Sequence, residues 1–238
     1  MMEKCRLCGE LAQLRNSHII PEFYYKPIYD EKHRFFELST NIEHKTKFPQ
    51  KGIREYLLCD NCENRLSKYE TYSATMFGSK TRAVKKGDEI IVNNIDYKLF
   101  KLHQISILWR IAISSRNIFS KIELPEVEPE LRSMIINNDP GNYNDYGCTL
   151  TFVVNEKALL TDLITTPEML IMDSNKYVRL IFGGYIWIFS LQKDENSFCN
   201  EYFLSKTGIM KIKIREANSL KILKSYANDL YRAGKLGE

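Results

Sequence analysis

Two Cys-x-x-Cys pairs constrain the first part of this chain more than any other feature. They are formed by Cys5 with Cys8 and by Cys59 with Cys62. Each pair can place two thiolates on one tetrahedral ion, so the spacing predicts a single structural Zn²⁺ site made of all four cysteines. A segment this small cannot fold on its hydrophobic core alone, and we expect the zinc to stabilise it. The competing interpretation is that the two pairs have separate roles.

The composition indicates a globular protein without a disulfide framework. Of the 238 residues, 44% are hydrophobic and 27% are charged, which is ordinary for a folded chain. The opening residues lack the apolar segment of a signal peptide, and no apolar run approaches the roughly 20 residues that cross a bilayer. We therefore expect a cytoplasmic protein with no membrane contact. In that compartment cysteines favour metal binding, and we expect Cys148 and Cys199 to be ordinary buried thiols.

The pattern of hydrophobic residues predicts an α+β chain. We expect an N-terminal treble-clef zinc (ββα-metal-like) domain at 1–86 and a domain of helices and antiparallel strands at 97–238. The first should contain a strand within Asn16–Tyr25, a helix at Glu63–Phe77 and a basic linker at 78–87. In the second, helices are expected at 97–116, 127–137 and 219–231, and strands at 149–154, 169–172, 177–182, 185–190 and 209–214.

The positive charge of the chain lies in its first segment. Residues 1–86 carry sixteen Lys and Arg against eleven Asp and Glu, whereas the remainder has eighteen against nineteen. This modest excess permits contact with nucleic acid, although four thiolates on one zinc ion would reduce it. Arg15, Arg54, Arg65 and Lys68 are candidates to contact phosphate groups, and an ordinary solvated surface cation is the default explanation for each.

A histidine motif, Ser17-His18-Ile19-Ile20-Pro21, lies between the two cysteine pairs. The order C-x-x-C, this motif, and a C-x-x-C that opens a helix resembles zinc-containing members of the HNH endonuclease family over residues 5–75. The resemblance implies a ββα-metal finger that hydrolyses phosphodiester bonds of nucleic acid, with DNA favoured over RNA. It also implies that His18 is the general base and that one Mg²⁺ or Mn²⁺ ion lies apart from the zinc. A neutral imidazole is suited to accept a proton near pH 7.

The resemblance also points to ligands for that second ion. Glu63 directly follows the last cysteine, at the position of the ligand on the helix, where the family usually has Asn or His. Asn64 competes for the role, and Glu70 is a further candidate because it shares a helix face with Glu63. Each acid can instead be a solvated residue that complements the helix dipole.

Ser17 departs from the family pattern, which commonly has an acid before the histidine. A hydroxyl is a weak ligand for a hard cation, so water or another carboxylate would take this place. Glu22, just beyond Pro21, is a weaker candidate for it. The departure leaves His18 open to a structural role, in which its ring bonds a nearby backbone carbonyl.

Two functions therefore remain open. The first is a metal-dependent nuclease whose second domain supplies target recognition or a protein contact. Its architecture resembles that of bacterial or phage-defence effectors, which is a hypothesis from architecture alone. The second is a non-catalytic zinc module that binds nucleic acid or a partner protein.

Overall fold

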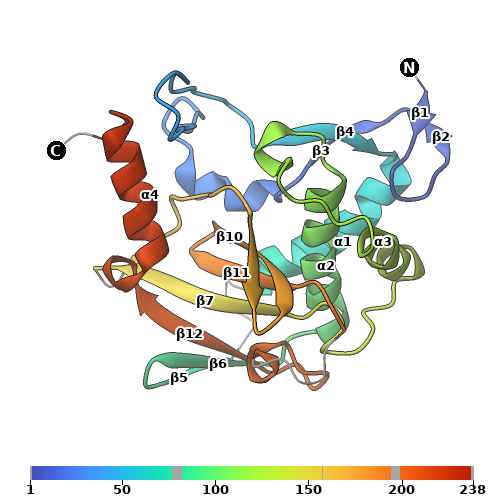
Figure 1. Ribbon diagram of the computed structural model, residues 1–238. Coiled ribbons are helices and arrows are strands. Elements are labelled where there is room, and N and C mark those ends of the chain that lie inside the picture. Colours follow the sequence, from blue (N-terminus) through green and yellow to red (C-terminus); the bar gives the residue numbers. More distant parts are fainter. Residues whose placement is uncertain (1, 77–81, 157, 194–198, 237–238) are drawn as a thin grey trace.

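The computed structural model describes residues 2–76, 82–156, 158–193 and 199–236 (Figure 1). Within these ranges the chain combines four helices with one main sheet and two short hairpins, which confirms the predicted α+β class. The helices are α1 (Asp60–Thr75), α2 (Tyr97–Ile113), α3 (Glu128–Asn137) and α4 (Lys221–Arg232).

The N-terminal part consists of the two antiparallel hairpins followed by α1. The hairpins pair β1 (Glu3–Lys4) with β2 (Leu11–Ala12), and β3 (Arg15–His18) with β4 (Arg54–Leu58). α1 begins at Asp60 rather than at the predicted Glu63 because Cys59, in an extended conformation, is its N-cap. The helix continues to Thr75, and its predicted end at Phe77 lies outside the described residues.

The main sheet contains eight strands in the order β5-β6-β12-β7-β11-β10-β9, with β8 paired to β7. They are β5 (Arg82–Lys86), β6 (Glu89–Asn93), β7 (Cys148–Asn155), β8 (Ala158–Leu159), β9 (Glu168–Met172), β10 (Asn175–Phe182), β11 (Tyr185–Ser190) and β12 (Met210–Glu216). All five strands predicted between 149 and 214 are present. The turn from β10 to β11 uses Gly183 and Gly184, both with positive φ angles, which glycine adopts without strain.

The sheet differs from the prediction in two respects. β12 runs parallel to β7, so the sheet is mixed rather than antiparallel. Residues 82–86, predicted as part of a linker, form the edge strand β5 against β6, while residues 78–81 lie outside the described residues. Charged residues are common on edge strands because they discourage pairing with other chains, and the lysines of β5 concealed its strand character.

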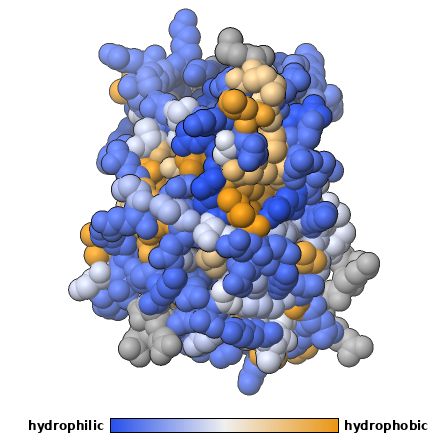
Figure 2. Space-filling view, turned by 90° about the vertical axis from the view of Figure 1, so that its right-hand side faces the viewer, coloured by the Kyte–Doolittle hydropathy of each residue, from blue (hydrophilic) through white to orange (hydrophobic). Residues whose placement is uncertain are grey.

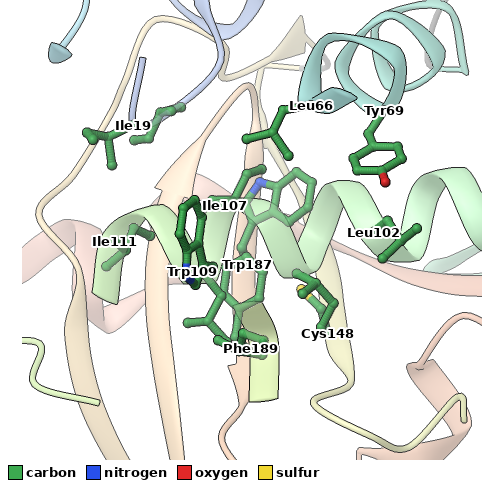
Figure 3. Close-up of a cluster of buried hydrophobic side chains, with 14 of the residues drawn as sticks. Ile19, Leu66, Tyr69, Leu102, Ile107, Trp109, Ile111, Cys148, Trp187 and Phe189 are labelled. Carbon is green, nitrogen blue, oxygen red and sulfur yellow. The ribbon is translucent and has the colours of Figure 1, made fainter. Parts of the chain in front are cut away.

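α2 is the central element of the fold and is buried on every side. All its residues from Phe100 to Ile111 are buried, which is the pattern of a core helix rather than an amphipathic surface helix. Figure 3 shows Leu66 and Tyr69 of α1 pointing toward α2, while Trp187 and Phe189 of β11 reach the same cluster from the sheet. Each fully buried Leu, Ile or Phe side chain stabilises the fold by about 1.5–3 kcal/mol.

Arginine side chains join the N-terminal part to the elements that follow by donating to backbone carbonyls. The pairs are Arg132 with Leu7 at 2.6 Å, Arg65 with Ile135 at 3.0 Å, and Arg116 with Arg54 at 2.7 Å. One hydrophobic cluster also runs from the cysteine region through α2 to the sheet. A division into separately folding domains at 1–86 and 97–238 stays a prediction.

The other side of the sheet is covered by α4 and the segments next to it. Leu220 and Leu223 pack against a small cluster formed by Val153, Ile181 and Ile186. Figure 1 shows α4 on the left of the sheet and α1, α2 and α3 on the right. Hydrophilic side chains cover most of the face in Figure 2, with apolar ones gathered near its centre. In the part of the chain that the structure describes, no helix is both long enough and apolar enough to cross a membrane.

Candidate metal centre and histidine site

The four cysteines come together from two separate turns of the backbone. Cys5 and Cys8 lie in the loop between β1 and β2, where Gly9 has a φ of +83° that favours glycine. The Gly9 N–H donates to the Cys5 carbonyl at 2.9 Å and closes this loop. Cys59 caps α1 and Cys62 lies in its first turn, so both thiols face the loop.

The spacing of the sulfur atoms fits a bound metal ion. The four Sγ atoms lie within 4.8 Å of one another, and those of Cys8 and Cys59 are 3.8 Å apart. A tetrahedral ion with sulfur ligands at about 2.3 Å needs about 3.8 Å between them. The Cys59 N–H donates to Sγ of Cys5 at 3.4 Å, and such a bond favours the thiolate. Among the described residues no other group of three or more His, Cys, Asp or Glu side chains is this close together.

His18 is the last residue of β3, and buried neighbours on both sides fix its position. Ser17 is 3% exposed, and Ile19 and Ile20 are fully buried. The Ile19 N–H also donates to the Ile53 carbonyl at 3.0 Å. The His18 side chain itself is 20% exposed. The strand is therefore held in the core while the imidazole remains accessible at the surface.

Glu22 contacts the imidazole from a short 3-10 turn that follows β3. Its Oε2 is 2.5 Å from Nε2 of His18 and 3.6 Å from Nη2 of Arg54. Its Oε1 accepts a hydrogen bond from the Tyr29 hydroxyl at 2.9 Å. The carboxylate is thus held from three sides, by a ring nitrogen, a guanidinium and a phenol.

Both acids predicted on α1 interact with Arg110 of α2. Glu63 interacts with the Ser17 hydroxyl, and its Oε1 is buried with no hydrogen-bond partner in the described ranges. The charge of Glu70 is close enough to His18 to influence its protonation. Glu22 and Glu70 therefore give the surroundings of His18 an acidic character that Arg54 partly offsets.

Arg110 of α2 supports this site from the core. The residue is 1% exposed, and its Nη1 donates to the His18 carbonyl at 2.8 Å and to Oε1 of Glu70 at 2.7 Å. Its Nε donates to the Ser106 carbonyl at 3.2 Å. One guanidinium thus links the end of β3, the middle of α1 and the central helix.

The environment shifts the protonation of two groups. Burial lowers the pKa of the His18 imidazole below its ordinary value, and Arg54 lowers it further, while Glu22 and Glu70 oppose the shift. Burial raises the pKa of the Glu63 carboxyl, against the opposing effects of Ser17 and Arg110. The neutral imidazole is therefore the major form of His18 near pH 7.

Other residues proposed from the sequence are exposed or make their hydrogen bonds and ion pairs with other partners. Asn64 is exposed and sits about 100° around the helix from Glu63. Arg65 donates to carbonyls at the end of α3, and Arg15 forms an exposed ion pair with Asp60. Lys68 is exposed. Of the four cations considered for phosphate contact, Arg54 is the one that borders the histidine.

Arg110 was not predicted from the sequence, and Glu22 was predicted only as a weaker candidate for a metal ligand. The signal for Arg110 was a charge directly between the apolar residues Trp109 and Ile111, where a buried cation needs partners nearby. The signal for Glu22 was weaker, because its contact with His18 depends on the 3-10 turn that follows Pro21.

Comparison of the chain with protein-family models, with curated proteins and with solved structures finds no match.

Proposed function

We propose that this chain is a metal-dependent endonuclease of the HNH type, which hydrolyses phosphodiester bonds of nucleic acid, with DNA favoured and His18 as the general base. The observation that carries the proposal is a neutral, accessible imidazole that the Glu22 carboxylate contacts, at the end of a strand of the same N-terminal part as the cysteine cluster. A base with a pKa near or below neutrality is suited to activate water at physiological pH.

We assign Zn²⁺ to the cysteine cluster and regard the β1–β2 loop, the β3–β4 hairpin and α1 as a treble clef. Four thiolates at tetrahedral spacing favour Zn²⁺ among divalent ions. A site in which the protein supplies all four ligands has no open position for substrate, so its role is structural. It would hold the start of α1 against the loop and keep Glu63 opposite Ser17.

In this proposal His18 accepts a proton from a water molecule while the water oxygen forms a bond to phosphorus. The bond from phosphorus to the leaving ester oxygen breaks, and that oxygen takes a proton from solvent. One water is consumed, and a phosphate monoester and a hydroxyl end are produced. The carboxylates of Glu22 and Glu70 stabilise the imidazolium that forms. A positioned base of this kind contributes about 10²–10⁴-fold to the rate.

The residues present also fit a divalent ion such as Mg²⁺ or Mn²⁺. Glu63 offers a buried carboxylate oxygen that lacks a hydrogen-bond donor, and Mg²⁺ commonly binds one or two carboxylates and keeps several waters. Glu70 is already bound by Arg110 through one oxygen, and Asn64 is exposed, so we assign Glu63 as the principal ligand. The ion would supply positive charge against the charge that develops on the phosphate.

Cleavage of plasmid DNA and of RNA with and without added Mg²⁺ or Mn²⁺ tests the proposal. We expect His18→Ala to lower the cleavage rate by about 10²–10⁴-fold while the zinc content stays unchanged. His44→Ala removes an exposed loop histidine and should cleave like the unaltered protein. Absence of cleavage by the unaltered protein with either ion, or full activity in His18→Ala, would overturn the assignment.

The pH dependence of cleavage should follow His18. A general base works in its neutral form, so activity should rise with pH through the His18 pKa and then level off. Because burial and Arg54 lower that pKa, the midpoint should lie below the ordinary histidine value of about 6.5. A profile of kcat/KM between about pH 5 and pH 8 measures it. A midpoint above the ordinary value would contradict the neutral base.

The alternative function is a non-catalytic zinc module that binds nucleic acid or a partner protein. The observation that favours it is Ser17, a buried hydroxyl that stands beside Glu63 where a second acid would complete a metal site. The cleavage assay separates the two, since the module predicts binding of the same nucleic acids without products at any ion concentration.

A further inference from the structure

We propose that Glu22 is a positioning residue that holds neutral His18 in the tautomer with its proton on Nε2, which leaves Nδ1 to accept the proton from water. The inference rests on the proposed function of His18, and it gives the two ring nitrogens different tasks. It also gives a role to an acid outside the cysteine pairs and the histidine motif.

The first argument is that neither contacting atom has a hydrogen-bond partner elsewhere in the described residues. Nε2 of His18 and Oε2 of Glu22 are both buried from solvent, and within the described residues neither forms another hydrogen bond. They lie 2.5 Å apart, with the oxygen off the ideal hydrogen-bond direction. Buried polar atoms are nearly always satisfied, so a small rotation of the ring that aligns this pair is strongly favoured.

The direction of the bond follows from the chemistry of the two groups. An ionised carboxylate can accept hydrogen bonds but cannot donate one, so the ring nitrogen that faces Glu22 must carry the proton. The 20% exposure of the His18 side chain comes from the rest of the ring because Nε2 is buried. Nδ1 is then the remaining basic nitrogen, on the part of the ring that water can reach.

The carboxylate is itself held in place, which a positioning residue requires. The Tyr29 hydroxyl donates to Oε1 of Glu22 at 2.9 Å and accepts from the Gly52 N–H at 3.1 Å. The Arg54 guanidinium forms an ion pair with Oε2 of Glu22 across 3.6 Å. A carboxylate fixed at both oxygens can orient the imidazole more firmly than a flexible surface acid.

The arrangement also explains how the positive charge of the protonated ring is stabilised. When Nδ1 takes a proton from water, the ring becomes an imidazolium whose Nε2–H still faces Glu22. The charged groups around the ring are then Glu22, Arg54 and Glu70, and the two carboxylates stabilise the new positive charge. No proton needs to move to Glu22 during the reaction.

A purely structural contact between Glu22 and His18 makes different predictions. It would stabilise the 3-10 turn against β3, and its loss would lower the melting temperature without changing which nitrogen is protonated. Glu22→Gln separates the two roles because the amide keeps the size of the side chain but can donate to Nε2. The proton of the neutral ring would then move to Nδ1, which can no longer act as the base.

The experiment records two-bond ¹H–¹⁵N correlations of the full zinc-loaded chain at a pH where His18 is neutral. The chain has four histidines, and the signal that His18→Ala removes identifies the residue. We expect the Nε2–H tautomer in the unaltered protein and in the control Glu31→Gln, an exposed acid nearby. We expect a shift toward the Nδ1–H tautomer in Glu22→Gln, with a mixture of the two in Glu22→Ala.

Cleavage assays on the same samples complete the test. Glu22→Gln should lower kcat/KM by about 10²–10⁴-fold, the contribution of a positioned general base, and the loss is about 10⁴-fold in kcat where the carboxylate partner of a catalytic histidine becomes an amide. An Nδ1–H tautomer in the unaltered protein, or an unchanged tautomer in Glu22→Gln, would overturn the inference. If the tautomers change as expected but no variant cleaves nucleic acid, the positioning by Glu22 is supported and the nuclease proposal fails.

Discussion

Cys62→Ser should reduce the bound metal from one ion per chain to nearly none and should unfold the N-terminal part. A structural Zn²⁺ held by small peptides contributes about 10–16 kcal/mol of apparent binding free energy, so losing one of four thiolates removes a large share of the stability. The two short hairpins and the start of α1 depend most on it, since they meet at the cysteines. Metal analysis by mass spectrometry and far-ultraviolet circular dichroism measure both effects.

Cys148→Ala is the matched control for that experiment. Cys148 is a buried thiol of β7 that lies outside the cysteine cluster. Its replacement should leave the metal content unchanged and lower stability only by the small amount expected for a minor cavity, about 1 kcal/mol. A folded Cys62→Ser chain that retains a full complement of metal would show that the four cysteines do not share one ion.

The second large effect is expected for Arg110→Met. The substitution leaves the carboxylate of Glu70 and the carbonyl of His18 without their buried donor. Removing one partner of a buried ion pair typically costs about 3–5 kcal/mol, which for a chain of this size lowers the melting temperature by roughly 6–20 °C. Chemical denaturation and a thermal melt of the zinc-loaded protein measure the change.

Two comparison variants make this result specific. Arg15→Met removes a cation whose ion pair with Asp60 is largely exposed, and it should change stability by less than about 1 kcal/mol. Adding Glu70→Gln to Arg110→Met should recover part of the loss because it neutralises the charge that was left unpaired. A stability of Arg110→Met within about 1 kcal/mol of the unaltered protein would contradict the buried role.

The features that the sequence predicted well are those encoded over short distances. The spacing of the two cysteine pairs alone predicted that the four thiols come together. Helical periodicity predicted α2 within a few residues, and Pro129 with the turn residues after Asn137 predicted α3. The alternation of apolar residues and the two-glycine turn predicted β10 and β11. In each case a local pattern determines the element, so no knowledge of distant contacts is needed.

The features that were missed depend on contacts between distant parts of the chain. The parallel pairing of β12 with β7 is set by how the chain returns to the sheet, which no local pattern records. β5 was not predicted because its lysines are unusual in a strand. Lysines destabilise a strand little when it lies at the edge of the sheet, as β5 does. The link from Arg110 to His18 joins residues from two elements that meet only after α2 enters the core.

The hydrogen bonds from Arg110 to His18 and Glu70 have a consequence for transferring the cysteine segment to another protein. A graft of residues 5–75 into another scaffold would carry the four cysteines, the histidine and the acids of α1. It would leave behind the guanidinium that α2 supplies to the His18 carbonyl and to Glu70. The transplanted histidine would then sit on a loosened strand beside an unneutralised acid, so a working chimaera would have to bring the central helix with it.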